Sequence, residues 1–171
     1  MKNILFLCFV MLLINNNTKI YGQNNSKNLV IGSCISGDCN NGFGIKKFPD
    51  GTIYLGEWWN DLPSGNGTVV FSDGTIYVGK FSEGLYHGNG TLMTNYTFYI
   101  GEFKNDKLEG NGTMFLKTGD MFLGEFKDGE LHGKGYHQNH DGIIEEGQFK
   151  NGKIIGDITL KNENYIIRKK Q

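Results

Sequence analysis

The chain has 171 residues, of which 26 are glycine and only two are proline. Glycine is therefore about twice as frequent as the roughly 7% of an average protein, and the scarcity of proline excludes a collagen-like or proline-rich chain. The formal net charge is −1, and the only basic cluster is Arg168-Lys169-Lys170. Nucleic acids and anionic membranes attract clustered lysine and arginine. We therefore expect no nucleic-acid partner.

The first 22 residues have the layout of a secretory signal peptide. Lys2 precedes an apolar run from Ile4 to Ile14, which is followed by a polar segment and then by Gly22. The apolar run is shorter than the about 20 residues that a membrane-spanning helix needs. We expect cleavage near Gly22 and export of the chain to the periplasm, the cell envelope or the medium. A retained N-terminal membrane anchor is the alternative.

A pattern of about 23 residues repeats through the remainder of the chain, which is a signature of repeat architectures. Each unit begins with an aromatic residue, a glycine two places later and a second aromatic residue four places later. These triplets are Tyr54-Gly56-Trp58, Tyr77-Gly79-Phe81, Tyr99-Gly101-Phe103, Phe122-Gly124-Phe126 and a degenerate Glu145-Gly147-Phe149. A second ladder of glycine pairs keeps the same step at Gly42/Gly44, Gly65/Gly67, Gly88/Gly90, Gly110/Gly112 and Gly133/Gly135. Two ladders in phase indicate a tandem repeat.

Each unit is predicted to be a strand, a tight turn and a second strand. Side chains at alternate positions of a strand share one face, so the triplet places its two rings and its glycine together. Pairs such as Asn60-Asp61 follow the triplet, and these residue types accept the left-handed backbone of a hairpin turn. The third junction between units, at Asn95-Tyr96, lacks the usual glycine and one residue. We expect a tighter or distorted turn there.

The predicted fold class is all-β, an elongated, twisted antiparallel β-sheet of tandem hairpins that forms a solenoid. Glycine can let a backbone lie close under an aromatic ring, and we expect the phenylalanine and tyrosine columns to stack along the array. A short linker, 23–30, precedes the repeats. The units are an atypical first repeat with two cysteines at 31–53, repeats at 54–76, 77–98, 99–121 and 122–144, a degenerate last repeat at 145–164 and a basic C-terminal tail at 165–171.

The pattern Tyr-x-Gly-Glu-Phe/Trp-x-Asn followed by Gly-x-Gly resembles the MORN (membrane occupation and recognition nexus) repeat. The resemblance covers roughly residues 31–157 and is carried by 54–67, 99–112 and 122–135, the last with Phe and Asp at the two ends of its first motif. The chain departs from it at Cys34-Ile35, at Glu145 and at Ile158. The resemblance implies an elongated twisted sheet and a role in scaffolding, protein contact or membrane association. It brings no catalytic residues with it.

Cys34 and Cys39 are the only cysteines after residue 22. Exported proteins meet oxidising conditions more often than cytosolic ones, so we predict a disulfide between them that attaches the first half-unit to the array. A zinc pair is the alternative, although two ligands do not complete a tetrahedral site.

Candidate catalytic and metal-binding residues are few. The place before each Gly-x-Gly step holds Ser64, His87, Glu109 and His132. Equivalent places in successive units should lie two strands, or roughly 9.6 Å, apart, whereas catalytic partners need about 3 Å. We expect surface variation there, and polar edge positions for the histidine group at 132, 137 and 140. No catalytic, cofactor or metal site is predicted.

Trp59 and Tyr86 lie outside the repeated ring columns and are candidate partner contacts, because tryptophan and tyrosine often anchor interfaces; packing at the sheet edge is their alternative role. The predicted function is that of a non-catalytic, exported scaffold or protein-binding surface. A peripheral module that binds membrane lipids is the alternative, and an envelope-associated enzyme is the second. The sequence leaves the oligomeric state open.

Overall fold

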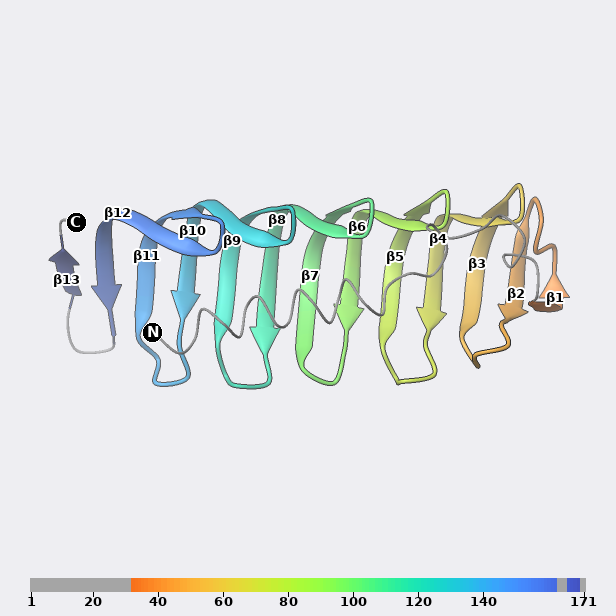
Figure 1. The fold of residues 1–171 in the computed structure, drawn as a ribbon, viewed down its shortest axis with the longest axis horizontal. Coiled ribbons are helices and arrows are strands. Elements are labelled where there is room, and N and C mark those ends of the chain that lie inside the picture. The colour runs from red at the N-terminus through yellow and green to blue at the C-terminus, as the bar shows by residue number, and fades with distance from the viewer. Residues whose placement is uncertain (1–31, 163–165, 170–171) are drawn as a thin grey trace.

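The computed structural model describes residues 32–162 and 166–169, and all of its regular elements are strands. The predicted signal peptide lies outside the described residues. Thirteen antiparallel strands form one sheet in sequence order, as Figure 1 shows. The strands are β1 (Ser33–Gly37), β2 (Phe43–Lys47), β3 (Ile53–Trp59), β4 (Leu62–Val70), β5 (Ile76–Ser82), β6 (Leu85–Met93), β7 (Thr97–Lys104), β8 (Lys107–Leu116), β9 (Met121–Lys127), β10 (Glu130–Gln138), β11 (Ile144–Lys150), β12 (Lys153–Lys161) and β13 (Ile166–Lys169). The all-β class and the open sheet of tandem hairpins are confirmed.

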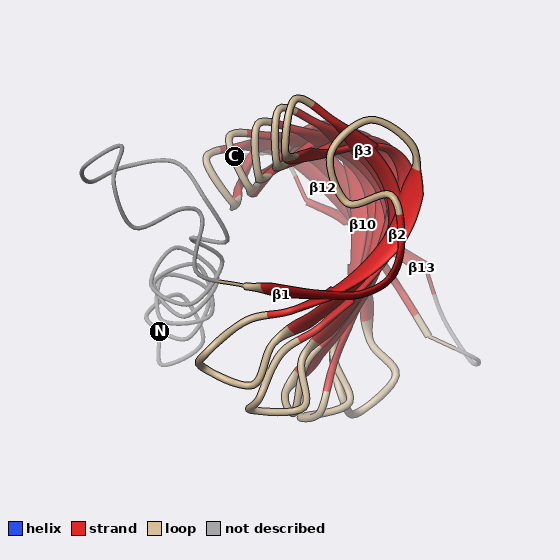
Figure 2. Ribbon diagram, turned by 90° about the vertical axis from the view of Figure 1, so that its right-hand side faces the viewer, coloured by secondary structure: helices blue, strands red, loops and turns tan. Residues whose placement is uncertain are grey.

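The sheet is curved as well as long. Seen along the array, the strands bend into an arc with turns at both of its ends (Figure 2). Burial alternates along the strands, and Tyr54, Gly56 and Trp58 of β3 are buried while their neighbours in sequence are exposed. The sheet therefore has an inner face that carries the core and an outer face that meets solvent.

The tight turns inside each unit have the predicted left-handed backbone. Between β3 and β4, φ is 48° at Asn60 and 62° at Asp61, and between β7 and β8 it is 50° at Asn105 and 65° at Asp106. Positive φ at both central residues is the type I′ geometry that matches the twist of paired strands. Successive turns are also joined to one another. The N–H of Gly84 donates to the Pro63 carbonyl at 2.9 Å, for example.

The turns that join one unit to the next are longer, with one exception. Residues 71–75 separate β4 from β5, and the N–H of Phe71 donates to the Thr75 carbonyl at 2.8 Å. Only residues 94–96 separate β6 from β7. There Thr94 Oγ1 accepts the N–H of Thr97 at 2.9 Å, and the N–H of Thr94 donates to the Thr97 carbonyl at 2.8 Å. The tighter turn predicted at Asn95-Tyr96 is confirmed.

The rings of the inner face form the core, but they do not stack as a column. Tyr77 is fully buried, and its ring meets Phe81 and Phe103 edge to face, with centroids 5.1 Å apart and interplanar angles of 88° in both pairs. Tyr99 meets Phe126 in the same way at 5.3 Å. The expectation of stacking was wrong in this respect, because an aromatic edge is attracted to an aromatic face.

A row of glycines crosses the sheet beneath these rings. Strand pairing places ten glycines directly opposite one another, from β2 to β11: Gly44, Gly56, Gly67, Gly79, Gly90, Gly101, Gly112, Gly124, Gly135 and Gly147. A Cβ added at Gly112 would lie 2.6 Å from Cζ of Tyr99. Only glycine therefore lets the tyrosine ring lie flat on the backbone.

Each of these tyrosines is also fixed by its hydroxyl group. Tyr54, Tyr77 and Tyr99 donate to the carbonyl three residues further on, over 3.0, 2.9 and 3.1 Å. The unit at 122–144 departs from this arrangement because its first ring, Phe122, has no hydroxyl. Its ring stacks on His137 at 4.5 Å, and the side chain of Leu131 covers the glycine row instead, with Cδ2 3.0 Å from a Cβ added at Gly135.

The two ends of the array differ from its middle. At the first end, β1 pairs with β2 through an irregular register between Cys34 and Ser36. At the other end, Ile166–Lys169 pairs with β12 as β13. This strand lies within the segment that we expected to be a basic tail. Its two consecutive β-branched residues, Ile166 and Ile167, favour the short strand.

We expect Gly112→Ala to lower the free energy of unfolding by about 3 kcal/mol, because the methyl group overpacks the core against the Tyr99 ring. The matched control is Gly135→Ala, in the same row, where the flexible Leu131 side chain can move aside. Urea unfolding of both variants measures the difference. Equal costs at the two positions would contradict the role assigned to the tyrosine ring.

Candidate functional site

Two adjacent rows of uncharged residues run across the outer face from β3 to β10, and we call them the outer band. Strand pairing aligns the first row as Ile53, Val70, Ile76, Met93, Phe98, Phe115, Met121 and Gln138, and the second as Leu55, Thr68, Val78, Thr91, Ile100, Thr113, Leu123 and Tyr136. Ten of these side chains are large, apolar and between 37% and 50% exposed. The outer band is thus an uncharged, mainly apolar surface that the core does not use, although Thr68, Thr91 and Thr113 interrupt its second row.

A row of polar residues, which we call the polar row, lies beside the outer band on the side of the tight turns. Its members are Glu57, Asn66, Lys80, Asn89, Glu102, Asn111, Glu125 and Lys134. Two of the carboxylates close the bulge after the tight turn: Glu57 Oε1 accepts the N–H of Asn66 at 2.8 Å, and Glu102 Oε1 accepts the N–H of Asn111 at 2.8 Å. The carboxylates of Glu57, Glu102 and Glu125 are all exposed to solvent.

Trp59 lies on the outer face at the end of β3 and is 65% exposed. It pairs across the turn with Leu62. Phe43, which is 60% exposed, pairs with Glu57 and is therefore a diagonal neighbour of Trp59 on the same face. Trp59 remains a candidate contact for a partner.

Tyr86 is not such a contact, because the structure places it in the core. Its side chain is fully buried, and its ring stacks on that of Tyr77 with centroids 3.7 Å apart. The expectation that this ring is exposed was wrong. Two places after each tight turn the chain carries Pro63, Tyr86, Leu108, Leu131 and Ile154. This apolar column was the signal that could have placed Tyr86 on the inner face.

Cys34 and Cys39 form a disulfide, with their Cα atoms 5.9 Å apart. The two sulfur atoms bond to each other, so the zinc alternative does not apply here. The loop after Cys39 is attached to the first complete unit, because the N–H of Trp58 donates to the Gly42 carbonyl at 2.7 Å and Trp58 Nε1 donates to the Gly44 carbonyl at 3.2 Å. The first half-unit is thus closed by the disulfide at its start and hydrogen-bonded to Trp58 of β3 at its end.

The residues before the Gly-x-Gly steps belong to separate hairpins. Ser64 is on β4, His87 on β6, Glu109 on β8 and His132 on β10. Glu109 serves a neighbouring turn, where its Oε2 accepts the N–H of Asp128 at 3.1 Å. Within residues 32–162 and 166–169, no group of three His, Cys, Asp or Glu residues is placed to hold a metal ion.

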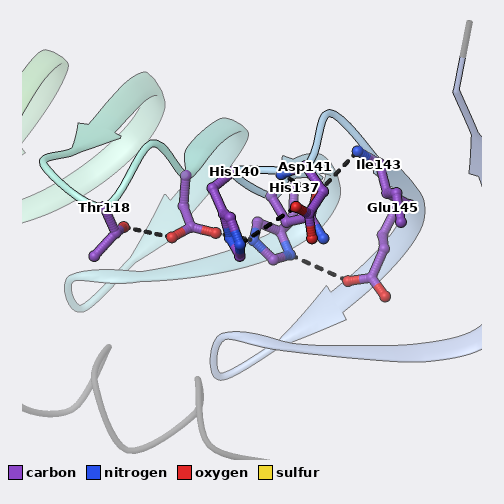
Figure 3. A network of polar contacts seen from close by, with 8 residues as sticks. Thr118, His137, His140, Asp141, Ile143 and Glu145 are labelled. Carbon is purple, nitrogen blue, oxygen red and sulfur yellow. Dashed lines mark hydrogen bonds and ion pairs between the residues drawn. The ribbon is translucent and has the colours of Figure 1, made fainter.

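His137 lies in a polar network on the inner face, which Figure 3 shows. Its Nδ1 is 3.1 Å from Glu145 Oε2 and its Nε2 is 3.4 Å from Asp120 Oδ1. Asp120 also accepts the hydroxyl of Thr118. We expected an exposed edge position, and for His137 that was wrong, since it takes the place that Val69, Leu92 and Met114 hold in earlier units. Each ring nitrogen of His137 therefore faces a carboxylate within this network.

The part of the chain that the structure describes contains no helix long and apolar enough to cross a membrane.

Asp106 is the carboxylate that the fold perturbs most clearly. Burial raises the pKa of Asp106 from 3.8 to about 6, and the hydrogen bond that its Oδ1 accepts from the N–H of Tyr86, at 2.8 Å, opposes that rise. A carboxyl group whose pKa is higher in the folded chain binds more protons there than in the unfolded chain. The contribution of Asp106 to the free energy of unfolding therefore falls as the pH rises from 3.8 to about 6 and stays lower above that range.

We expect Asp106→Asn to raise the free energy of unfolding by about 1–2 kcal/mol at neutral pH, and by less at about pH 4. The amide keeps the acceptor for Tyr86 and tolerates the φ of 65°. Asp61→Asn, at the equivalent turn position with a φ of 62°, controls for turn preference. Urea unfolding at both pH values tests this, and a gain that does not change with pH would contradict it.

The family model for the MORN repeat matches residues 41–53, 54–76, 77–94, 99–121, 122–142 and 146–154. These segments together make up more than half of the chain. A search of curated proteins found no match to it.

Proposed function

The chain belongs to the MORN repeat family, and we propose that it is a non-catalytic scaffold that binds a partner protein outside the cytoplasm. MORN repeats commonly bind proteins or membrane lipids. We favour a protein partner over a lipid because the aromatic side chain of Trp59 is exposed on the sheet. Tryptophan is among the residues that most often dominate the energy of a protein interface.

The surroundings of Trp59 support this choice. Its ring stands at the end of a strand whose opposite side is fixed by the buried Trp58 and Tyr54, in edge-to-face contact at 4.8 Å. A tryptophan side chain has only two rotatable torsions, so it loses little conformational entropy when it binds. Phe43 and Leu62 extend the apolar surface beside it, so a partner could bury one continuous patch.

Lipid binding is less favoured by the charges of the same face. Anionic membranes attract clustered basic residues, whereas the polar row mixes acidic, basic and neutral side chains. Among the exposed lysines beside the tight turns, Lys107 is paired with a carboxylate, because its Nζ lies 2.7 Å from Asp128 Oδ1.

Trp59→Ala should reduce recovery of the partner by at least about tenfold when the full chain is used to capture proteins from its native compartment, since loss of a central tryptophan can cost about 2 kcal/mol of binding energy. Tyr96→Ala is the matched control, because Tyr96 is 55% exposed but lies at a turn of the other edge. Thermal unfolding should be unchanged for both variants. Equal recovery with both variants would contradict the assigned contact.

Export is part of the proposal and is supported by the apolar segment 4–14 and by the disulfide of Cys34 and Cys39. We expect the chain recovered from its native cells to lie outside the cytoplasm and to lack residues 1–22. Intact-mass measurement of each cell fraction tests this. The full mass in the membrane fraction would indicate a retained anchor, and the full mass in the cytoplasm would overturn export.

A further inference from the structure

We propose that the outer band is a self-association surface, which packs against the outer band of a second copy of this chain with the two arrays antiparallel. The inference goes beyond the binding function proposed above, because it concerns a different surface from the one around Trp59.

The outer band carries no charge, and its first row from Ile53 to Met121 is apolar throughout. Side chains such as Val78, Ile100 and Leu123 are 47%, 50% and 43% exposed, and they belong to alternate strands of a single row. Soluble monomers rarely expose a contiguous apolar patch larger than a few hundred Å². A surface without a single charge needs a partner surface that is also uncharged, and a second outer band meets that condition.

The size of the outer band fits an interface between two copies. Eight strands spaced about 4.8 Å apart extend over about 38 Å, and two rows with their side chains are about 14 Å wide. Each copy would bury about 500 Å², so the pair would bury about 1,000 Å², the lower bound for a specific interface. The strands bend into an arc (Figure 2), and the buried rings must lie inside it because the described residues supply no second layer to cover them. The outer band is then on the convex side, so two copies would meet along a strip and not over the whole face.

The charges of the polar row favour the antiparallel arrangement. When two such faces are related by a two-fold axis along the strand direction, β3 of one copy faces β10 of the other, β4 faces β9, β5 faces β8 and β6 faces β7. The polar row then meets itself in reverse order. Glu57 faces Lys134, and each of Lys80, Glu102 and Glu125 faces an asparagine. No like charges meet, and one opposite pair forms at each end of the strip.

The first test is the concentration dependence of the mass of the full chain, measured by sedimentation equilibrium. We expect a monomer–dimer equilibrium with a dissociation constant in the micromolar range. Ile100→Glu should weaken it by at least about tenfold, because a carboxylate would be buried without a partner. Ile155→Glu is the matched control. Ile155 is 45% exposed on β12, outside the outer band, at the place where an earlier unit carries Glu109.

The second test fixes the direction of the two arrays. Lys134→Glu places like charges opposite each other at both ends of the strip and should weaken the dimer several-fold. Adding Glu57→Lys to that variant restores opposite charges and should restore the dimer. A salt titration should reduce the difference between the single and double variants.

Three outcomes would overturn the proposal. The chain could remain a monomer at every concentration, Ile100→Glu could have no larger effect than Ile155→Glu, or the double charge reversal could leave the dimer as weak as the single one. Sedimentation with uncharged phosphatidylcholine vesicles can give a further outcome that would overturn the proposal. If the wild-type chain binds these vesicles and Ile100→Glu abolishes that binding while the mass stays that of a monomer, the outer band meets lipid and not a second copy.

Discussion

The contact between a tyrosine ring and the bare backbone of a glycine row is what allows a single sheet to have a core. A sheet usually buries one face against a second layer, and the described residues contain no such layer. Here the rings of Tyr54, Tyr77 and Tyr99 lie flat on the strands because no Cβ atoms stand beneath them. The phenylalanines and Trp58 then close over the tyrosines edge to face. The core is therefore built within the curve of one sheet.

That arrangement also decides which surfaces remain available for binding. The inner face is occupied by its own rings, whose exposed fractions are 5% or less for every member of the repeated columns. A partner must then use the outer face, the turns or the two ends of the array. The outer face is divided lengthwise into an apolar band and a polar row, while Trp59 marks its first complete hairpin. Different partners could thus be recognised by different strips of one surface.

Much of this could be predicted from the sequence because the period of two in a strand and the period of 23 in the chain constrain the same residues. The face shared by Tyr77, Gly79 and Phe81 follows from alternation alone, and so does the position of the tight turn. Tyr86 was misplaced because the repeated triplets lie on the first strand of each unit, whereas Tyr86 belongs to the apolar column of the second strand. His137 was misplaced for a related reason, since a polar residue in a core column is recognisable only when Asp120 and Glu145 are known to meet it. The edge-to-face angles between the rings depend on three-dimensional packing, so the spacing of residues in the sequence could not predict them.

The direction of the strands has a mechanical consequence. Every strand from β1 to β13 runs across the long axis of the array, so the hydrogen bonds between strands point along that axis. Tension applied between the two ends would load those bonds one strand pair at a time, in the manner of a zipper, and not all together as in shear. Since each hairpin contacts only its neighbours, extension would release one hairpin after another in steps of similar force. The array would then yield gradually under load and could lengthen many-fold before its last pair of strands separated.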